Sequence, residues 1–290
     1  MPKSFSKILV FVVSWLAIIY VLIGANVDKI LQFSPFVGMG IVGAIFANST
    51  GAGGGVVFIP AFQWLAFTEQ QSLATSIGIQ CMGMTAGSLS WLAFAKKDTS
   101  NLEHWQPFLI IVFLCGALSV AGINFVHGMG IDSPGSLKQN FSFFSLGLGS
   151  LLLVSVLRVN SQSIKTKLTP TDFVIVSLIG IFGGMITAWL SVGVGEILAL
   201  YLLIRGFSAT VSVAAAVCVS AISVWSAISY HVLANNVVWE VLVFAGPAAV
   251  IGGTVARYIA IWMPARALKI FFACWVLFMG LITSPLISGF

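Results

Sequence analysis

Long runs of hydrophobic residues, separated by short polar stretches, dominate this sequence. Seven runs approach or exceed the roughly 20 apolar residues that a helix needs to cross a bilayer core. Because lipid offers no hydrogen bonds to an open backbone, we expect each run to be a membrane-spanning helix. The seven runs lie at 8–25, 72–94, 108–126, 141–157, 208–232, 237–257 and 267–288.

Two further hydrophobic runs, 35–67 and 171–207, are each too long for one ordinary span and too short for two, and glycines interrupt both. If each crosses the membrane once, with the N-terminus inside, the thirteen Lys and Arg residues divide seven inside and six outside. If each enters and returns, the division becomes eleven to two. Lys and Arg prefer the cytoplasmic side in short loops. We therefore predict re-entrant segments, a cytoplasmic N-terminus and a periplasmic C-terminus.

The two interrupted runs match each other when the chain is shifted by 140 residues. Gly53 then meets Gly193, Gly55 meets Gly195, and Pro107 meets Pro247. Three crossings separate the two copies, so they enter the membrane from opposite sides. Inverted repeats with broken helices near the midplane are the architecture of many secondary transporters.

We accordingly predict an all-α integral membrane protein with two inverted repeats, each a glycine-broken re-entrant helix pair followed by three transmembrane helices. An N-terminal transmembrane anchor (1–34) precedes repeat 1 (35–157), and a cytoplasmic linker (158–170) joins it to repeat 2 (171–290).

Composition supports a membrane protein and excludes several other classes. Hydrophobic residues make up 59% of the chain and charged residues 7%, whereas soluble domains carry about 25% charged residues. The net charge of +5 does not indicate nucleic-acid binding, because the basic residues lie between the apolar runs. Neither the cysteines nor the histidines have metal-ligand spacing, and the catalytic motifs G-x-S-x-G and H-E-x-x-H do not occur. We predict no metal, no cofactor and no enzymatic activity.

The first interruption carries a polar, glycine-rich stretch directly before an apolar helix. Glycine lets a ligand approach the main chain, and the N-terminus of the following helix attracts anions through its unbonded N–H groups. We therefore predict a substrate site for a small anion, without a basic side chain, at Asn48, Ser49, Thr50, Gly51, Gly53, Gly54 and Gly55.

The second interruption adds Ser191, Gly193 and Gly195 to this predicted site and places Glu196 where the first copy has Val56. An ionisable group at membrane depth is a functional hypothesis by default. Glu196 is our candidate for carrying a coupling proton, protonated when the anion is bound and ionised when it is not. The alternative is that Glu196 only satisfies the N-terminus of its own helix.

Small and polar residues form a stripe on the helices that follow the two interruptions. Thr75, Ser76 and Gln80 lie at helical spacing, and Ser220 lies at the position equivalent to Gln80. The stripe is a candidate lining of the substrate cavity. It is equally well explained as helix packing, because small residues dominate contacts between transmembrane helices.

Together these residues resemble the TauE/SafE sulfite exporter family of membrane permeases. The resemblance rests on 51–55 with Pro60, on the triplet 74–76, and on the weaker second copy, and it covers about 35–285. It implies transport of sulfite, organosulfonates such as sulfoacetate, or related sulfur-containing anions across the bacterial inner membrane. The second copy departs from the motif, with Val194 and Leu200 in place of the third glycine and the proline.

Two other functions fit the same pattern. Re-entrant loops also build the selectivity filters of channels, so an anion channel is one alternative. The other is a permease for thiosulfate-type compounds that uses Cys81 or Cys218 as a transient sulfur contact. The sequence leaves the exact substrate, the direction of transport and the oligomeric state open. The predicted partners are a small anion and the lipid bilayer.

Overall fold

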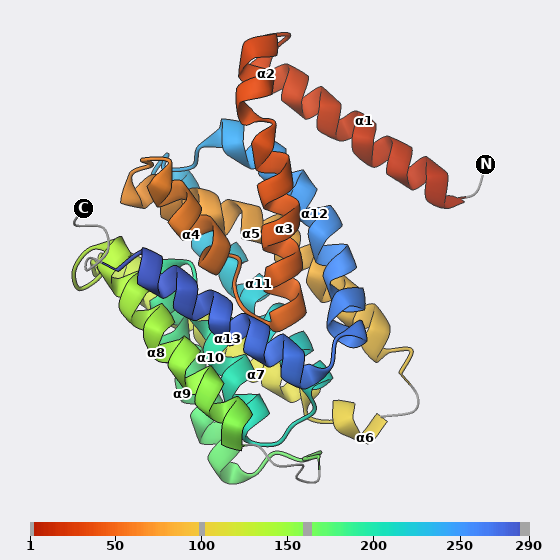
Figure 1. The fold of residues 1–290 in the computed structure, drawn as a ribbon, viewed down its shortest axis with the longest axis vertical. Helices are drawn as coiled ribbons and strands as arrows, with labels where there is room; N and C mark the ends of the chain where they lie inside the picture. Colours follow the sequence, from red (N-terminus) through yellow and green to blue (C-terminus); the bar gives the residue numbers. More distant parts are fainter. Residues whose placement is uncertain (1–2, 99–101, 159–163, 285–290) are drawn as a thin grey trace.

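The computed structural model describes residues 3–98, 102–158 and 164–284, and these form helices without strands (Figure 1). The helices are α1 (Lys3–Ile23), α2 (Val27–Phe33), α3 (Pro35–Thr50), α4 (Gly55–Trp64), α5 (Glu69–Ala95), α6 (Leu102–Trp105), α7 (Phe108–Met129), α8 (Leu137–Arg158), α9 (Pro170–Leu190), α10 (Val194–Ile204), α11 (Ala209–Leu233), α12 (Trp239–Trp262) and α13 (Ala265–Ile282).

The predicted helical class is confirmed. As far as the structure describes them, all seven uninterrupted runs fall on helices, namely α1, α5, α7, α8, α11, α12 and α13. The end of the last run, 285–288, lies outside the described residues. Within the described residues, five helical stretches are long and apolar enough to cross a membrane: Val27–Thr50, Leu102–Met129, Pro170–Leu190, Ala209–Leu233 and Trp239–Trp262. The last three of these belong to α9, α11 and α12, so membrane-length helices extend well into the second half of the chain.

Both interrupted runs fold back on themselves. In the first run, α3 ends where Gly51 takes a left-handed backbone with φ of 82°, and the chain returns as α4 (Figure 1). The ring of Phe36, near the start of α3, consequently lies 6.3 Å from the ring of Phe62, near the end of α4. In the second run, Ser191 takes the equivalent left-handed conformation with φ of 61° after α9. Helix α10 then returns toward the start of α9.

The helix boundaries of the two copies differ by 140 residues in the first part of each copy, as the sequence alignment predicts. In the later part of each copy they do not. Helices α3 and α9 end at Thr50 and Leu190, and helices α5 and α11 begin at Glu69 and Ala209. Beyond that point the alignment is wrong. Pro107 directly precedes α7, whereas Pro247 lies inside α12. The physical reason is the connector before α7, which contains α6 and is longer than the connector before α12.

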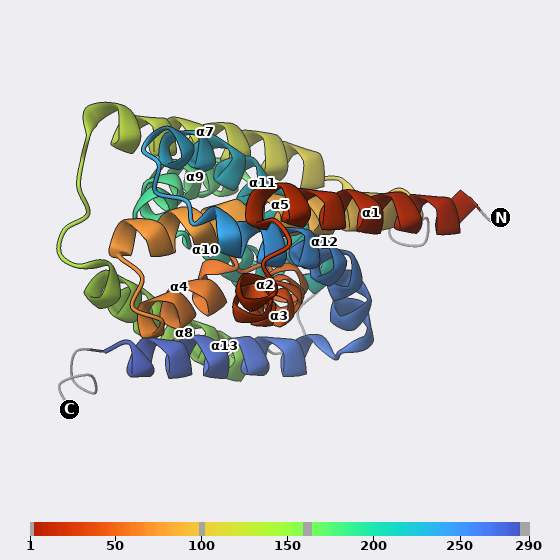
Figure 2. The same cartoon turned by 90° about the horizontal axis from the view of Figure 1, so that it is seen from above.

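The first helix of each broken pair packs on a helix of the other predicted repeat. Helix α3 packs on α12 and helix α9 packs on α7, in both cases where glycine allows the backbones to approach. A Cβ atom on Gly40 of α3 would lie 2.2 Å from the carbonyl oxygen of Ala245, and one on Gly180 of α9 would lie 2.9 Å from that of Cys115. Figure 2 shows α8 and α13 along one edge, where Phe272 and Val276 of α13 join a hydrophobic cluster with both broken segments.

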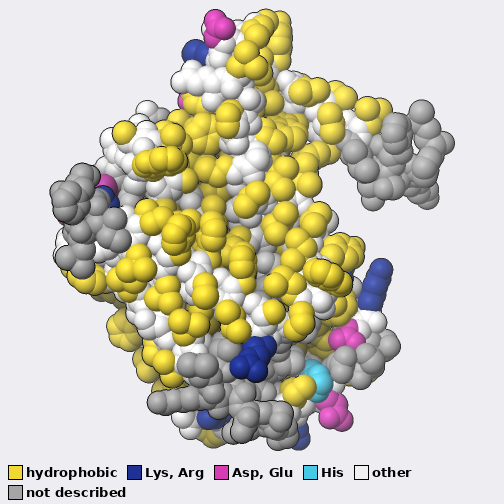
Figure 3. Space-filling view, in the orientation of Figure 1, with side chains coloured by type: hydrophobic (Ala, Val, Ile, Leu, Met, Phe, Trp, Pro, Cys, Tyr) yellow, Lys and Arg dark blue, Asp and Glu magenta, His cyan; other side chains and the backbone are white. Residues whose placement is uncertain are grey.

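The ends of the helices define two opposite faces. The Glu69 face holds the start of α5, the loop from α7 to α8, and the end of α11, and the side-chain oxygen Oε1 of Glu69 accepts a hydrogen bond from Leu137 N. The Asp172 face holds the start of α9 and the end of α10, and Lys165 N donates to the carbonyl oxygen of Gly206 there. Between the ends, hydrophobic side chains cover the surface in Figure 3.

Candidate functional site

The two broken segments, 51–55 and 191–195, meet inside the protein, and we call this contact the glycine junction. The approach is reciprocal. A Cβ atom on Gly55 would lie 2.6 Å from the carbonyl oxygen of Ser191, and one on Gly195 would lie 2.9 Å from that of Gly51. Both contacts are therefore open only to glycine, which has no Cβ. The residues that make the two contacts correspond across the repeat, since Gly55 aligns with Gly195 and Gly51 aligns with Ser191 under the 140-residue shift.

Glu196 joins the two segments through its carboxylate group. Oε1 accepts a 2.6 Å hydrogen bond from Gly53 N in the first segment, and Oε2 accepts a 2.7 Å bond from Gly193 N in the second. The Glu196 side chain is buried, with 1% of the residue exposed. Gly53 and Gly193 are the glycines that align across the repeat, so one carboxylate binds two corresponding amides. Hydrogen bonds from N–H groups to a charged acceptor are among the stronger ones in proteins.

Gln80 makes a second polar bridge across the glycine junction. Its Oε1 accepts a 2.8 Å hydrogen bond from Gly54 N, and its Nε2 donates to the Oγ of Ser191 at 2.7 Å. Ser76, one turn earlier on α5, exchanges a 2.9 Å hydrogen bond with the same Oγ. Part of the predicted polar stripe therefore lies in the junction and connects α5 to both broken segments.

The prediction of unbonded amides in the first segment is corrected by these contacts. Gly53 N and Gly54 N are bound by Glu196 and Gln80, and Ala52 N donates to Oγ1 of Thr50. The amides do face a carboxylate, as an anion site requires, but the carboxylate belongs to the protein. Because Glu196 lies 143 residues from Gly53, no local sequence pattern predicts that contact.

The other predicted site residues lie at varying distances from this centre. Asn48 donates to the carbonyl oxygens of Ala44 and Gly83, and Ser49 donates to that of Phe46, so these two side chains serve helix α3 and its packing on α5. Thr75 binds the amide of Val238 at the start of α12, away from the junction. Ser220 lies at the glycine junction, because a Cβ atom on Gly195 would lie 2.1 Å from its Oγ.

Two cavities lie on opposite sides of the glycine junction. The larger one, which we call the vestibule, has a volume of about 300 Å³ and opens on the Glu69 face, with Leu73 and Ala188 in its wall. The smaller one has a volume of about 20 Å³, and Thr50 and Ala199 line it together with Lys269. Ala188, in the last turn of α9, lines the vestibule, and Thr50, the last residue of α3, lines the smaller cavity. Each of these helices therefore reaches one cavity with the end that lies at the junction.

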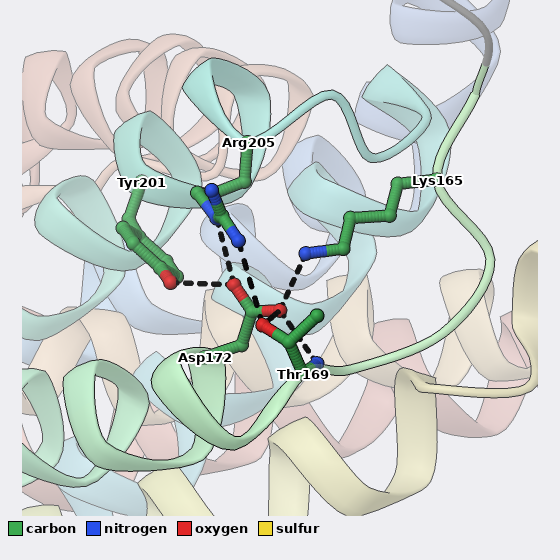
Figure 4. Close-up of polar contacts among 5 residues, drawn as sticks. All are labelled: Lys165, Thr169, Asp172, Tyr201 and Arg205. Atoms are coloured by element: carbon green, nitrogen blue, oxygen red, sulfur yellow. Dashed lines mark hydrogen bonds and ion pairs between the residues drawn. The ribbon is translucent and has the colours of Figure 1, made fainter.

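An ion cluster around the buried carboxylate of Asp172 holds the second broken pair together (Figure 4). Oδ1 of Asp172 accepts hydrogen bonds from Arg205 Nε at 2.8 Å and Tyr201 Oη at 2.7 Å. Oδ2 accepts bonds from Lys165 Nζ and from the amide and hydroxyl of Thr169. The hydrogen bond to Asp172 raises the pKa of the Arg205 guanidinium.

Sequence reasoning did not identify this cluster. The available signal was the spacing of Thr169 and Asp172 directly before an apolar run, which is typical of a helix N-terminus and says nothing of Tyr201 or Arg205.

The cysteines of the thiosulfate alternative lie outside the glycine junction. Cys81 donates from Sγ to the carbonyl oxygen of Val224 at 3.4 Å and belongs to a hydrophobic cluster formed by α5, α7, α9 and α11. Cys218 is buried in a second hydrophobic cluster. Within the described residues, no group of three or more His, Cys, Asp or Glu side chains is arranged to hold a metal ion.

Comparison with family profiles gives a match over most of the chain. The family profile described as "Sulfite exporter TauE/SafE" matches residues 36–283. No curated protein and no solved structure matches the chain. The matched range begins at α3 and ends directly after α13, so it includes both broken pairs and the glycine junction.

Proposed function

Because this chain belongs to the sulfite exporter TauE/SafE family, we propose that it is a secondary transporter of a small sulfur-containing anion. The family consists of membrane transporters, and the apolar helices make this chain a multi-pass membrane protein. The proposed substrates are sulfite and organosulfonates such as sulfoacetate, carried across the inner membrane with the proton motive force as the energy source.

The contact that carries this proposal is the carboxylate of Glu196 on the amides of Gly53 and Gly193. A sulfite or sulfonate group resembles a carboxylate in offering several oxygen acceptors around one centre. When Glu196 takes up a proton, one of its oxygens becomes a hydrogen-bond donor and no longer suits an N–H group. The freed amide then becomes available to an oxygen of the substrate. One proton and one anion would enter the junction together.

The chain direction and the charges support an inverted membrane arrangement. Both broken pairs fold back, the first from the Glu69 face and the second from the Asp172 face. Among the described side chains, the Asp172 face holds Lys96, Lys97, Lys165, Lys167, Arg205, Arg257, Arg266 and Lys269, and the Glu69 face holds Lys29 and Lys138. The bias of Lys and Arg toward the cytoplasm therefore favours the Asp172 face as the cytoplasmic one.

The unequal cavities support alternating access. Among the described residues, the vestibule on the Glu69 face is much larger than the cavity toward the Asp172 face, about 300 Å³ against about 20 Å³. In transporters with broken helices, the substrate site lies between such cavities and its access changes sides. The glycine junction holds that position here.

Replacement of Glu196 by Gln tests the proposed coupling. Glutamine has nearly the same shape, but its amide nitrogen is a donor and would face the N–H of Gly53 or Gly193. We expect Glu196→Gln to abolish the stimulation of sulfite or sulfoacetate flux by a pH gradient in proteoliposomes, while flux down the anion gradient persists. The matched control is Glu103→Gln on the exposed side of α6.

Two results would contradict the proposal. Unchanged stimulation by the pH gradient in Glu196→Gln would leave Glu196 as a purely structural residue. Unitary conductance steps in planar bilayers, in place of saturable flux, would identify the protein as a channel.

A further inference from the structure

The residues that line the vestibule have no role in the function proposed for the glycine junction. Its volume of about 300 Å³ is at the lower end of the range for small-molecule sites. Polar residues from α7, α11 and the following loop line it, namely His127, Tyr230, His231 and Asn236, beside the apolar side chains of Leu73 and Trp189. It therefore offers hydrogen-bond donors and an apolar wall in one space.

His231 is the unusual residue of this group. It is buried, with 3% of its surface exposed, and neither ring nitrogen has a hydrogen-bond partner among the described residues. Buried polar groups almost always have a partner, and an exception calls for an explanation such as a ligand. Because His231 lines the vestibule, a ligand there is the natural partner for its N–H group.

The neighbouring rings hold the His231 imidazole in place. His127 stacks on Tyr230 with ring centroids 4.2 Å apart, and the His231 ring stands edge-on to both, at 5.5 Å from His127 and 5.4 Å from Tyr230. A ring packed on two sides loses little further freedom on binding, so a hydrogen bond from it contributes more of its energy to affinity.

The charged groups of the vestibule determine how binding should depend on pH. Glu69 and Asp132 also line it, and both are exposed. One carboxylate oxygen of Glu69 accepts a hydrogen bond from Leu137 N. No Lys or Arg is among the lining residues. A proton taken up by an imidazole adds positive charge beside the bound ligand, so an anion is favoured at lower pH.

From this arrangement we propose that the vestibule is a second binding site for a small oxyanion with an apolar body, with His231 as its hydrogen-bond donor. The inference rests on the proposed function and extends it. It makes the vestibule the place where the transported anion is held on the Glu69 face, before or after it occupies the glycine junction.

The experiment measures binding of methanesulfonate, whose charge is constant over the range in which an imidazole titrates, from about pH 5 to about pH 8. The purified full-length protein is titrated in detergent, and the rise in unfolding temperature reports binding. Chloride at the same ionic strength is the reference. We expect a saturable rise in the wild type, with tighter binding at the acidic end.

His231→Gln should weaken binding at the acidic end about tenfold or more, because a donor that can carry a charge is replaced by a neutral one, and it should reduce the pH dependence. The matched control is His104→Gln, a half-buried histidine of α6 remote from the vestibule, which should bind like the wild type. Wild-type affinity in His231→Gln would overturn the proposal. So would the absence of saturable binding to the wild type.

If His231→Gln does not fold, the pH dependence of the wild type decides. The proposal has the imidazole hold the anion more tightly once it takes up a proton, and equal or weaker binding at acidic pH contradicts that. The result is separable from the proposed function. Coupling that depends on Glu196, combined with unaltered binding in His231→Gln, would leave the transporter proposal intact. Binding that depends on His231, without any flux in proteoliposomes, would defeat only the transporter proposal.

Discussion

Gly55 and Gly195 each lie against a carbonyl oxygen of the other broken segment. Their importance was predictable from the interrupted hydrophobic runs, but the reason was not. The expected role was an open turn that presents amides to a ligand. The observed role is contact between two backbones, in which a Cβ atom at Gly55 would lie 2.6 Å from Ser191 O and 2.6 Å from a methyl group of Val192.

Alanine at these glycines should therefore prevent the junction from closing. We expect Gly55→Ala to lower stability by about 1–3 kcal/mol, as overpacking of a tight core does, and to abolish transport. The measurements are the unfolding temperature in detergent and anion flux in proteoliposomes. Gly147→Ala in α8 is the control, because a Cβ atom there meets nothing within 4 Å. Equal behaviour of the two variants would contradict the close approach.

Gly195→Ala should be partly rescued by a second substitution. The nearest atom to a Cβ at this position is the Ser220 Oγ, at 2.1 Å, and Gly51 O follows at 2.9 Å. Ser220→Ala removes the first conflict and leaves the second. We expect the double variant to be more stable than Gly195→Ala alone. Additive losses, measured by thermal unfolding of all three variants, would contradict contact between Ser220 and Gly195.

At the scale of helices, different contacts hold the two helices of each broken pair together. In the second pair, Asp172 at the start of α9 binds Tyr201 and Arg205 at the end of α10. The positions 140 residues earlier hold Gln32, Ala61 and Leu65, which cannot form such a cluster. The first pair uses rings instead, with Phe62 stacked on Phe67 at a centroid distance of 5.1 Å and packed near Phe36.

Removal of Asp172 should loosen the second pair selectively. Asp172→Asn leaves Arg205 and Lys165 without their shared anion, and charged hydrogen bonds of this kind contribute about 1.5–3 kcal/mol each. We expect faster hydrogen exchange in 194–204 and a lower unfolding temperature, without faster exchange in 55–64. The control is Asp28→Asn on the exposed surface of α2. Uniformly faster exchange in both pairs would show that the ion cluster stabilises the whole fold.

At the scale of the whole molecule, the hydrophobic runs were sufficient to locate the long helices, because a backbone in lipid must satisfy its own hydrogen bonds. The distribution of Lys and Arg then predicted that the two interrupted runs fold back. The partners of these helices were not predictable. Helix α3 packs on α12 and helix α9 packs on α7 through small residues such as Gly252, where a Cβ atom would lie 2.3 Å from Ile41 O. Glycines that serve packing and glycines that serve the junction look alike in the sequence.

The membrane orientation gives the last prediction. Gln106 precedes α7 on the Asp172 face and Gln139 follows it on the Glu69 face, and both are exposed. After the exposed Cys274 is replaced by Ser, single cysteines at these positions can be labelled with a membrane-impermeant thiol reagent. Because most basic residues lie on the Asp172 face, we expect Gln139→Cys to react in cells with an intact inner membrane and Gln106→Cys only after permeabilisation. The reverse pattern would invert the orientation and place the vestibule in the cytoplasm, and labelling of both residues from one side would mean that α7 does not cross the membrane.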